Sequence, residues 1–319
     1  MGQLLDTACD AGLLEETGAL QSVEPEVVCA FSVIHLHISH FLPSHLIYTL
    51  IPFRHAFHLG NFERHMATVY ITGGATGIGA ATVQKFASNG DDVAVFDINQ
   101  EAVEQLASEV DSGSVTYFET DVRNRDAVRK SIAAANEELG PPNTLFVNAG
   151  VQKLQGIFEM EDDDIDLIID VNLKGALYTV AEAAALMRDA SEGGTIVLMA
   201  SDQALVGKEG SIVYGATKGG VAQMAKSLAV ALSPHQIRVN AVCPATVKTP
   251  LTDGVFKWLA DKHFDGDVDA AWAAEAELLP IGRVAQPPEI AEVVFFLSQP
   301  TSSFMTGALV PVDGGLTAQ

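Results

Sequence analysis

The chain has 319 residues, of which 48% are hydrophobic and 18% are charged, and this is enough apolar side chain to fill a well-buried core. Its 41 acidic and 18 basic residues give a formal net charge of −23. Nucleic acid and anionic membranes attract clustered Lys and Arg, so this balance argues against both as partners. The three cysteines show no CxxC or Cys/His spacing typical of zinc, which predicts no metal site and a reducing, cytoplasmic setting.

The composition changes near Met66. Seven of the nine histidines and no lysine precede it. The early apolar stretch is interrupted by histidine and proline and has no run of about 18 apolar residues, so no membrane span is expected. Three interpretations of residues 1–65 remain open: a start mispredicted upstream of Met66, a poorly ordered extension, or a peripheral anchor. We favour the first, because "MATVYITGG" opens a domain, residues 66–319, at its first strand.

Short apolar runs rich in β-branched residues predict seven strands after Met66. They are residues 68–72, 92–97, 114–119, 144–149, 194–200, 237–242 and 308–312. Helical patterns separate them, and this alternation predicts an α/β fold: a single doubly wound Rossmann-type domain with a seven-stranded parallel sheet. Ligands of such folds bind beyond the carboxyl ends of the strands, where the strand order reverses.

The first predicted strand runs into "TGGATGIG", residues 72–79. Gly73, Gly77 and Gly79 permit a tight turn and a close approach of the backbone, and the helix that follows offers free N–H groups to a pyrophosphate. Glycines also serve ordinary turns, but the strand–turn–helix context favours a phosphate site that includes Thr76 and Ile78.

Asp97 ends the second predicted strand, 18 residues after Gly79. A carboxylate there can accept both hydroxyls of an adenosine ribose and would repel a 2′-phosphate. The alternative is a helix N-cap, for which Asp is well suited. No Arg or Lys follows in "FDINQEA" to receive a phosphate, so NAD is expected rather than NADP.

Tyr214 and Lys218 lie four residues apart in a predicted helix, on the same face. Alone, such a pair is usually an ordinary surface contact. A second interpretation is chemical: a nearby ammonium lowers the pKa of a phenol toward the working pH, which suits proton transfer.

Ordered motifs decide between these interpretations. They are "TGGATGIG", Asp121–Val122, "NAG" at 148–150, Asn172, Ser201, the Tyr214/Lys218 pair, "RVNAVCPATVKTP" at 238–250, "GRVAQPPEIAEVVFFLS" at 282–298 and "VDGG" at 312–315. In this order they resemble the short-chain dehydrogenase/reductase family over nearly all of residues 67–315. The finer likeness is to its NAD-dependent sugar and hydroxy-acid dehydrogenases.

The resemblance implies cofactor contacts for Asp121 and Val122 beside the adenine, and for Val247 and Thr249 near the nicotinamide. It also implies that the cofactor channel is lined by Asn148, Ala149 and Gly150. The sequence departs from the family at Ala245, where glycine is usual, which puts in doubt any conformation there with a positive φ.

The resemblance makes Tyr214 the acid/base group, while Lys218 would lower its pKa and hold the nicotinamide ribose. Ser201 would hold the substrate oxygen, although a serine at a strand end can simply bond the backbone. Asn172 would fix a water linked to the lysine and complete a proton relay; the alternative is a residue that only kinks the helix.

Substrate contacts are expected from Gln152, Asp202, Gln203, Ser201 and Tyr214, and from residues 250–282, where Trp258 and Trp272 form an apolar wall or only pack a helical flap. The amide of Gln203 and the carboxylate of Asp202 suit a polyhydroxylated ligand, because each needs a hydrogen-bond partner when buried. The favoured function is NAD-dependent oxidation of a sugar, sugar acid, polyol or hydroxy acid. The alternatives are a 3-oxoacyl-thioester reductase and a non-catalytic NAD-binding sensor or scaffold. The predicted helices at 163–190 and 212–233 are apolar on more than one face, so the surplus apolar surface must be buried elsewhere. The resemblance implies a second copy as the partner, since family members commonly pair these two helices in dimers and tetramers, so a homotetramer is expected, with a homodimer next.

Overall fold

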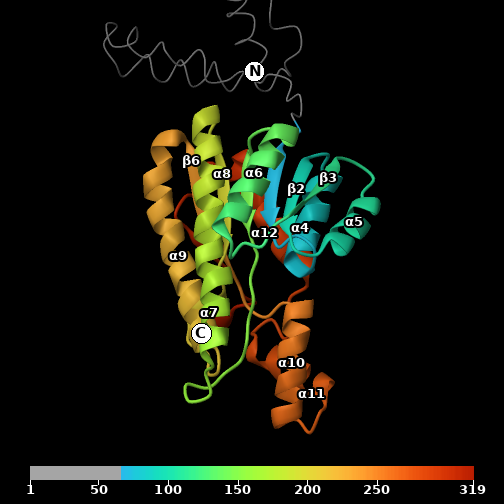
Figure 1. The fold of residues 1–319 in the computed structure, drawn as a ribbon. Coiled ribbons are helices and arrows are strands. Elements are labelled where there is room, and N and C mark those ends of the chain that lie inside the picture. Colours follow the sequence, from blue (N-terminus) through green and yellow to red (C-terminus); the bar gives the residue numbers. More distant parts are fainter. Residues whose placement is uncertain (1–65) are drawn as a thin grey trace, which may run out of the picture. The chain divides into compact units, whose positions relative to one another are not determined.

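A computed structural model describes residues 66–319, and the interpretations of residues 1–65 lie outside the described residues. Its seven strands form one sheet, in which every neighbouring pair is parallel (Figure 1). The strands are β1 (Thr68–Thr72), β2 (Asp92–Asp97), β3 (Ser114–Glu119), β4 (Thr144–Val147), β5 (Gly194–Met199), β6 (Ile237–Pro244) and β7 (Leu309–Val312). Their order, β3-β2-β1-β4-β5-β6-β7, reverses between β1 and β4. The predicted fold class is therefore confirmed.

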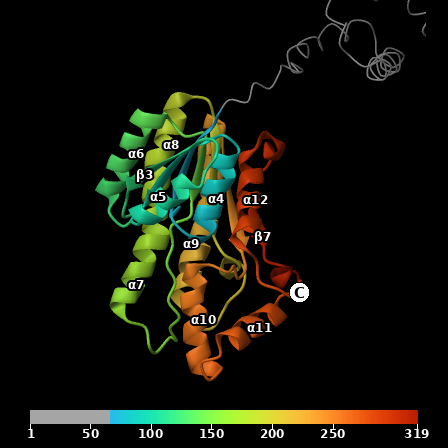
Figure 2. The same ribbon diagram turned by 90° about the vertical axis from the view of Figure 1, so that its right-hand side faces the viewer.

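Helices cover both faces of the sheet, as Figure 2 shows. One face packs against α6 (Arg125–Leu139), α8 (Ala176–Ala190) and α9 (Ile212–Leu232). The other packs against α4 (Gly77–Ser88), α5 (Gln100–Ser108) and α12 (Pro287–Ser298). Alternate residues of a strand point to opposite faces, so Tyr70 joins the first core and Ile71 the second. Two covered faces explain why the strands are continuous apolar runs.

The helix expected over residues 163–190 is interrupted. It consists of α7 (Asp162–Ile169), a π-helical segment (Asp170–Gly175) and α8. The buried Asn172 lies in the π-helical segment. Gly175 ends it, and a Cβ there would lie 2.8 Å from Cγ2 of Val122. The absence of a side chain at Gly175 thus lets the helix lie close to the loop after β3.

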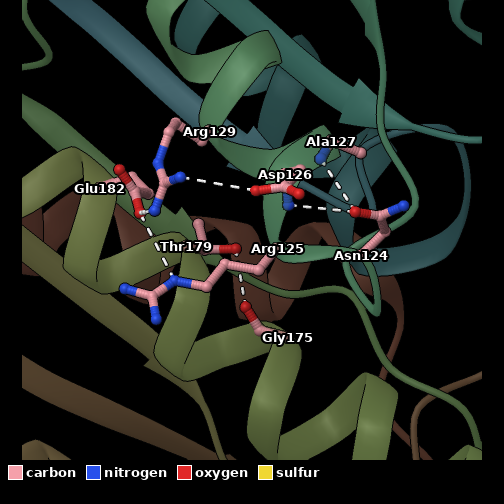
Figure 3. A network of polar contacts seen from close by, with 8 residues as sticks. All are labelled: Asn124, Arg125, Asp126, Ala127, Arg129, Gly175, Thr179 and Glu182. Carbon is pink, nitrogen blue, oxygen red and sulfur yellow. Dashed lines mark hydrogen bonds and ion pairs between the residues drawn. The ribbon is translucent and has the colours of Figure 1, made fainter.

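Ion pairs join α6 to α8 beside that loop (Figure 3). Asn124 caps α6 by accepting hydrogen bonds from the backbone N–H groups of Asp126 and Ala127. Arg125 and Arg129 both reach Glu182 on α8, with nitrogen–oxygen distances of 3.7 and 3.4 Å. These contacts fix the start of α6, and with it the loop that carries Asp121 and Val122.

Two further helices, α10 (Pro250–His263) and α11 (Val268–Leu278), form a flap with its own small core at the lower end of both views (Figures 1 and 2). Trp272 stacks on Phe256 with ring centroids 3.8 Å apart, whereas Trp258 is 41% exposed. Trp272 therefore packs inside the flap, and Trp258 lies on the surface of the flap. The remaining short 3-10 helices are Asp202–Ala204, Ser233–His235, Pro300–Ser302 and Leu316–Ala318. Within residues 66–319, no helix is both long and apolar enough to cross a membrane.

Candidate active site

A cavity of about 640 Å³ opens at the carboxyl ends of the strands. All the residues predicted for the site line it, except Gly79 and Asn172. It extends from the loops after β2 and β3 to those after β5 and β6, and so passes the point between β1 and β4 where the strand order reverses. This is where the fold class places ligands.

The glycine loop is shaped by close backbone packing. Gly73 has a φ of +65°, and a Cβ there would lie 2.7 Å from the Cα of Ala149. A Cβ at Gly79 would overlap the carbonyl oxygen of Gly73. Asn148 donates from Nδ2 to that oxygen over 2.7 Å and holds the loop in place. Thr76 precedes α4 without capping it through its side chain, so the first N–H groups of the helix remain free for an anion.

Asp97 holds the same loop from the end of β2. Its Oδ2 accepts a hydrogen bond from the backbone N–H of Ala75 over 3.0 Å, and its Oδ1 accepts from those of Ile98 and Asn99. The cap of α5 is Asn99, whose side chain accepts from the N–H of Ala102. Asp97 is thus not an N-cap, and it lines the cavity where the ribose site is expected.

Asp121 follows β3 and is bound by a residue that the sequence analysis missed. Arg123 donates from Nη2 to Oδ2 of Asp121 over 2.6 Å, and this hydrogen bond lowers the pKa of the carboxyl group. Arg123 also lines the cavity. Arg123 follows β3, whereas a cation for a 2′-phosphate is expected in the glycine loop or directly after β2.

Tyr214, Lys218 and Ser201 meet at the other end of the cavity. Lys218 donates from Nζ to the carbonyl oxygen of Met199 over 2.7 Å, and Nζ lies 5.5 Å from the ring centroid of Tyr214. Burial raises the pKa of Tyr214 to about 12, although hydrogen bonding to Ser201 opposes this rise. Burial also lowers the pKa of Lys218 to about 8. The predicted lowering of the tyrosine pKa is therefore not seen in the protein alone, because desolvation of the phenolate outweighs the hydrogen bond to Ser201.

Asn172 is buried behind this group. Its Oδ1 accepts from the backbone N–H of Val151 over 2.8 Å, and its Nδ2 donates to the carbonyl oxygen of Val151 and to Oγ1 of Thr217. It therefore fixes the segment after Gly150 against α9. Its position in the π-helical segment agrees with the kink alternative, while the water relay remains a prediction.

The substrate end is lined by polar groups from the loop after β5 and by apolar groups from α10. Gln152 donates from Nε2 to Oγ of Ser211 over 3.2 Å, and Gln203 donates its backbone N–H to Oγ of Ser201. Among the cavity-lining side chains, Leu251, Val255, Phe256 and Glu275 fall within the expected residues 250–282, and Thr246 falls within the motif at 238–250. Lys208 was missed, because no motif marks it.

Neither backbone strain at Ala245 nor a metal site is found in the described residues. Outside glycine, a positive φ occurs there only at Ser191, Gln236 and Asp265, so Ala245 fits its position without the strain that its departure from the family suggested. No group of three or more His, Cys, Asp or Glu side chains in residues 66–319 is arranged to hold a metal ion.

Comparison with known proteins identifies the family. The protein family described as "Enoyl-(Acyl carrier protein) reductase" matches residues 73–317. Meso-2,3-butanediol dehydrogenase from Serratia marcescens is 34% identical over 78% of this chain and 94% of its own length. The 3-oxoacyl-[acyl-carrier-protein] reductase FabG from Thermotoga maritima is 33% identical over 77% of this chain and 96% of its own.

A solved structure shares the fold and holds a cofactor. It is the 3-ketoacyl-(acyl-carrier-protein) reductase from Brucella melitensis complexed with NADH, with a TM-score of 0.70 and 27% identity over 79% of this chain and 98% of that one. The extent and identity of these matches show that the chain is an oxidoreductase of the short-chain dehydrogenase/reductase family, whose members bind a nicotinamide cofactor.

Proposed function

We propose that the protein transfers hydride between NAD and a secondary alcohol or hemiacetal carbon of a small polar substrate. The observation that carries this proposal is the placement of Ser201, Tyr214 and Lys218 in the same cavity as the glycine loop and Asp97. A nicotinamide ring bound between these two ends would supply the hydride chemistry, while the protein binds, orients and moves the proton.

In the oxidation direction Tyr214 takes the hydroxyl proton of the substrate. Ser201 hydrogen-bonds the same substrate oxygen and sets its distance from the phenol. The ammonium of Lys218 and the positive charge of the oxidised cofactor both favour the phenolate, and so counter the desolvation that keeps the phenol protonated in the protein alone. In reduction, the phenol donates its proton to the forming alkoxide.

We propose NAD rather than NADP because of the groups around the ribose position. The Asp97 carboxylate is held there by three backbone N–H groups, and a 2′-phosphate would face this negative charge. The one cation lining this part of the described cavity, Arg123, is already bonded to Asp121.

A second candidate is reduction of a 3-oxoacyl thioester, which the description of the matching family and the name of the Thermotoga maritima relative favour. The chain's charge of −23 is unfavourable for docking an acidic carrier protein. We therefore rank it below the small polar substrate.

A substrate screen tests the proposal. The purified protein is mixed with NAD⁺ or NADP⁺ and with sugars, polyols and hydroxy acids, and the formation of reduced cofactor is followed by absorbance. Acetoacetyl thioester with NADH or NADPH is assayed in parallel. We expect NAD⁺-dependent oxidation of at least one small polar compound. Turnover confined to the thioester would favour the second candidate.

We also propose a homotetramer, with a dimer next. Leu177 on α8 is 49% exposed, and Val230 on α9 is 79% exposed. Such apolar residues on neighbouring helices suit burial against a second copy. Light scattering coupled to gel filtration measures the mass directly, and a monomer at micromolar concentration would refute this assignment.

A further inference from the structure

Three charged side chains meet at the substrate end of the cavity: Asp202, Lys208 and Glu275. We propose that this cluster makes the enzyme selective for uncharged polyhydroxylated substrates, such as vicinal diols and sugars, and excludes their carboxylate analogues. The inference rests on the proposed function and narrows its substrate class.

Lys208 is paired with two carboxylates, so its positive charge is already balanced before a substrate enters. Its Nζ lies 2.9 Å from Oδ2 of Asp202 and 3.7 Å from Oε1 of Glu275. The Asp202 side chain is only 3% exposed, and the Glu275 side chain is 17% exposed. Two carboxylates shielded from solvent thus surround one ammonium, and the cluster carries a net negative charge.

The other two cationic side chains that line the described cavity, Arg123 and Lys218, are hydrogen-bonded to other groups of the protein. Arg123 is bonded to Asp121 after β3, four strands along the sheet from β5 and Ser201. Lys218 is buried, and its Nζ bonds the carbonyl oxygen of Met199. Among the residues described, the cavity therefore presents no uncommitted cation at its substrate end.

Two side-chain oxygens at this end are open acceptors. Oε1 of Glu275 contacts Oγ1 of Thr246, while Oε2 has no partner among residues 66–319. Gln203 also lines the cavity, and its Oε1 is buried without a partner in that part of the chain. A buried acceptor needs a donor, and a substrate hydroxyl can supply one. A carboxylate only accepts, so it would leave these oxygens unpaired and add charge repulsion.

The cluster also joins two parts of the site. Ser201 donates from Oγ to Oδ1 of Asp202 over 2.7 Å, so the proposed catalytic serine is directly tied to it. Glu275 belongs to α11 of the flap, while Asp202 and Lys208 belong to the loop after β5. A substrate held by Ser201 and Tyr214 therefore lies beside this charge rather than far from it.

Matched substrate pairs test the inference with the intact protein. Propane-1,2-diol is compared with lactate, butane-2,3-diol with 3-hydroxybutanoate, and galactose with galacturonate, each with NAD⁺. We expect kcat/KM for the uncharged member to exceed that for the acid by at least about tenfold. Equal or faster oxidation of the acids would overturn the inference and leave the proposed dehydrogenation standing. If no member of any pair is oxidised while NADH binding is retained, the proposed function fails, and this inference fails with it.

Variants test whether the cluster is the cause. Glu275→Gln should reduce the preference for the uncharged member several-fold, through a lower KM for the acid. Glu277→Gln is the matched control, because Glu277 lies on the same helix, is exposed and does not line the cavity. Lys208→Gln removes the positive charge and should increase the preference. NADH fluorescence verifies that each variant still binds the cofactor. If Glu275→Gln no longer binds the cofactor, Lys208→Gln alone is used for the test. An unchanged ratio of kcat/KM between the uncharged substrate and its acid would refute the assignment of the selectivity to these residues.

Discussion

The two ends of the cavity are built differently. The cofactor end is shaped by the main chain: glycines allow close packing around Gly73, and Asp97 and Asn148 bond backbone atoms of the loop. The substrate end is shaped by side chains, and its cluster combines a loop after β5 with a helix of the flap. A main-chain site tolerates little change, whereas a side-chain site can change its selectivity by single substitutions. We therefore propose that the first end fixes the cofactor and that the second sets the substrate.

Tyr214→Phe should have the largest effect, because the proposed acid/base group acts where the two ends meet. We expect turnover to fall by about 10²–10⁴-fold, since that is the usual contribution of general acid–base catalysis. NADH binding should be nearly unchanged. Tyr178→Phe on α8 is the control, because Tyr178 does not line the cavity. A Tyr214→Phe variant that keeps more than about a hundredth of the wild-type rate would exclude the tyrosine as the acid/base group.

Gly79→Ala tests the claim that the cofactor end depends on main-chain packing. The added methyl group would overlap the carbonyl oxygen of Gly73, so the loop must shift at a cost of about 1–3 kcal/mol. We expect NADH binding to weaken by about tenfold or more. In the control Gly254→Ala, the exposed glycine of α10 has no heavy atom within 4 Å of the added Cβ. Because alanine favours helix by about 1 kcal/mol, that control should be at least as stable as the wild type, measured by thermal unfolding.

This difference between the ends also explains what could be predicted from the sequence. The strands and the glycine loop follow from local patterns, since β-branched runs and glycines act on their own neighbours. Glu275 and Lys208 are far apart in the sequence and form no motif, so each resembles an ordinary surface charge until the flap brings them together. The π-helical segment was missed because the periodicity of a helix hardly reveals one wider turn. The raised pKa of Tyr214 was missed because burial, unlike charge, is not visible in the Tyr–Lys spacing.

Asp97→Ala tests whether the cofactor end sets the cofactor preference. The wild type should prefer NAD⁺ over NADP⁺, and the variant should lose at least about tenfold of that preference, since hydrogen bonds to a charged group contribute about 1.5–3 kcal/mol. Asp97→Asn separates two effects, because its amide oxygen can still accept from the N–H of Ala75 while the charge is gone. The measurement is kcat/KM for both cofactors. Faster turnover of NADP⁺ by the wild type would contradict the prediction.

The pKa of Tyr214 shows whether a cofactor bound at the cofactor end changes the ionisation of the proposed acid/base group. Because burial raises its pKa to about 12, from the usual 10, the phenol should stay protonated past pH 10 in the free protein. Bound NAD⁺ adds positive charge, which favours the phenolate, so it should lower this pKa by about one pH unit or more. The phenolate absorbance in the near ultraviolet is titrated with and without NAD⁺, and the Tyr214→Phe signal is subtracted. An unchanged midpoint would mean that the cofactor does not activate the tyrosine.

Removing residues 1–65 should have the smallest effect, because the described part of the chain alone supplies a lining for both ends of the cavity. The described lining begins at Gly73, and the start of β1 is held within residues 66–319: Asp91 accepts from the N–H of Ala67 over 3.1 Å, and Asn143 accepts from that of Thr68 over 2.9 Å. With these backbone groups satisfied, a chain that begins at Met66 should fold and keep kcat/KM and NADH affinity within about twofold of the full chain. Both proteins are compared in the same assay, and their thermal unfolding is recorded. Loss of folding would show that the first 65 residues belong to the fold, whereas a selective change in KM for the substrate would assign them to the substrate end.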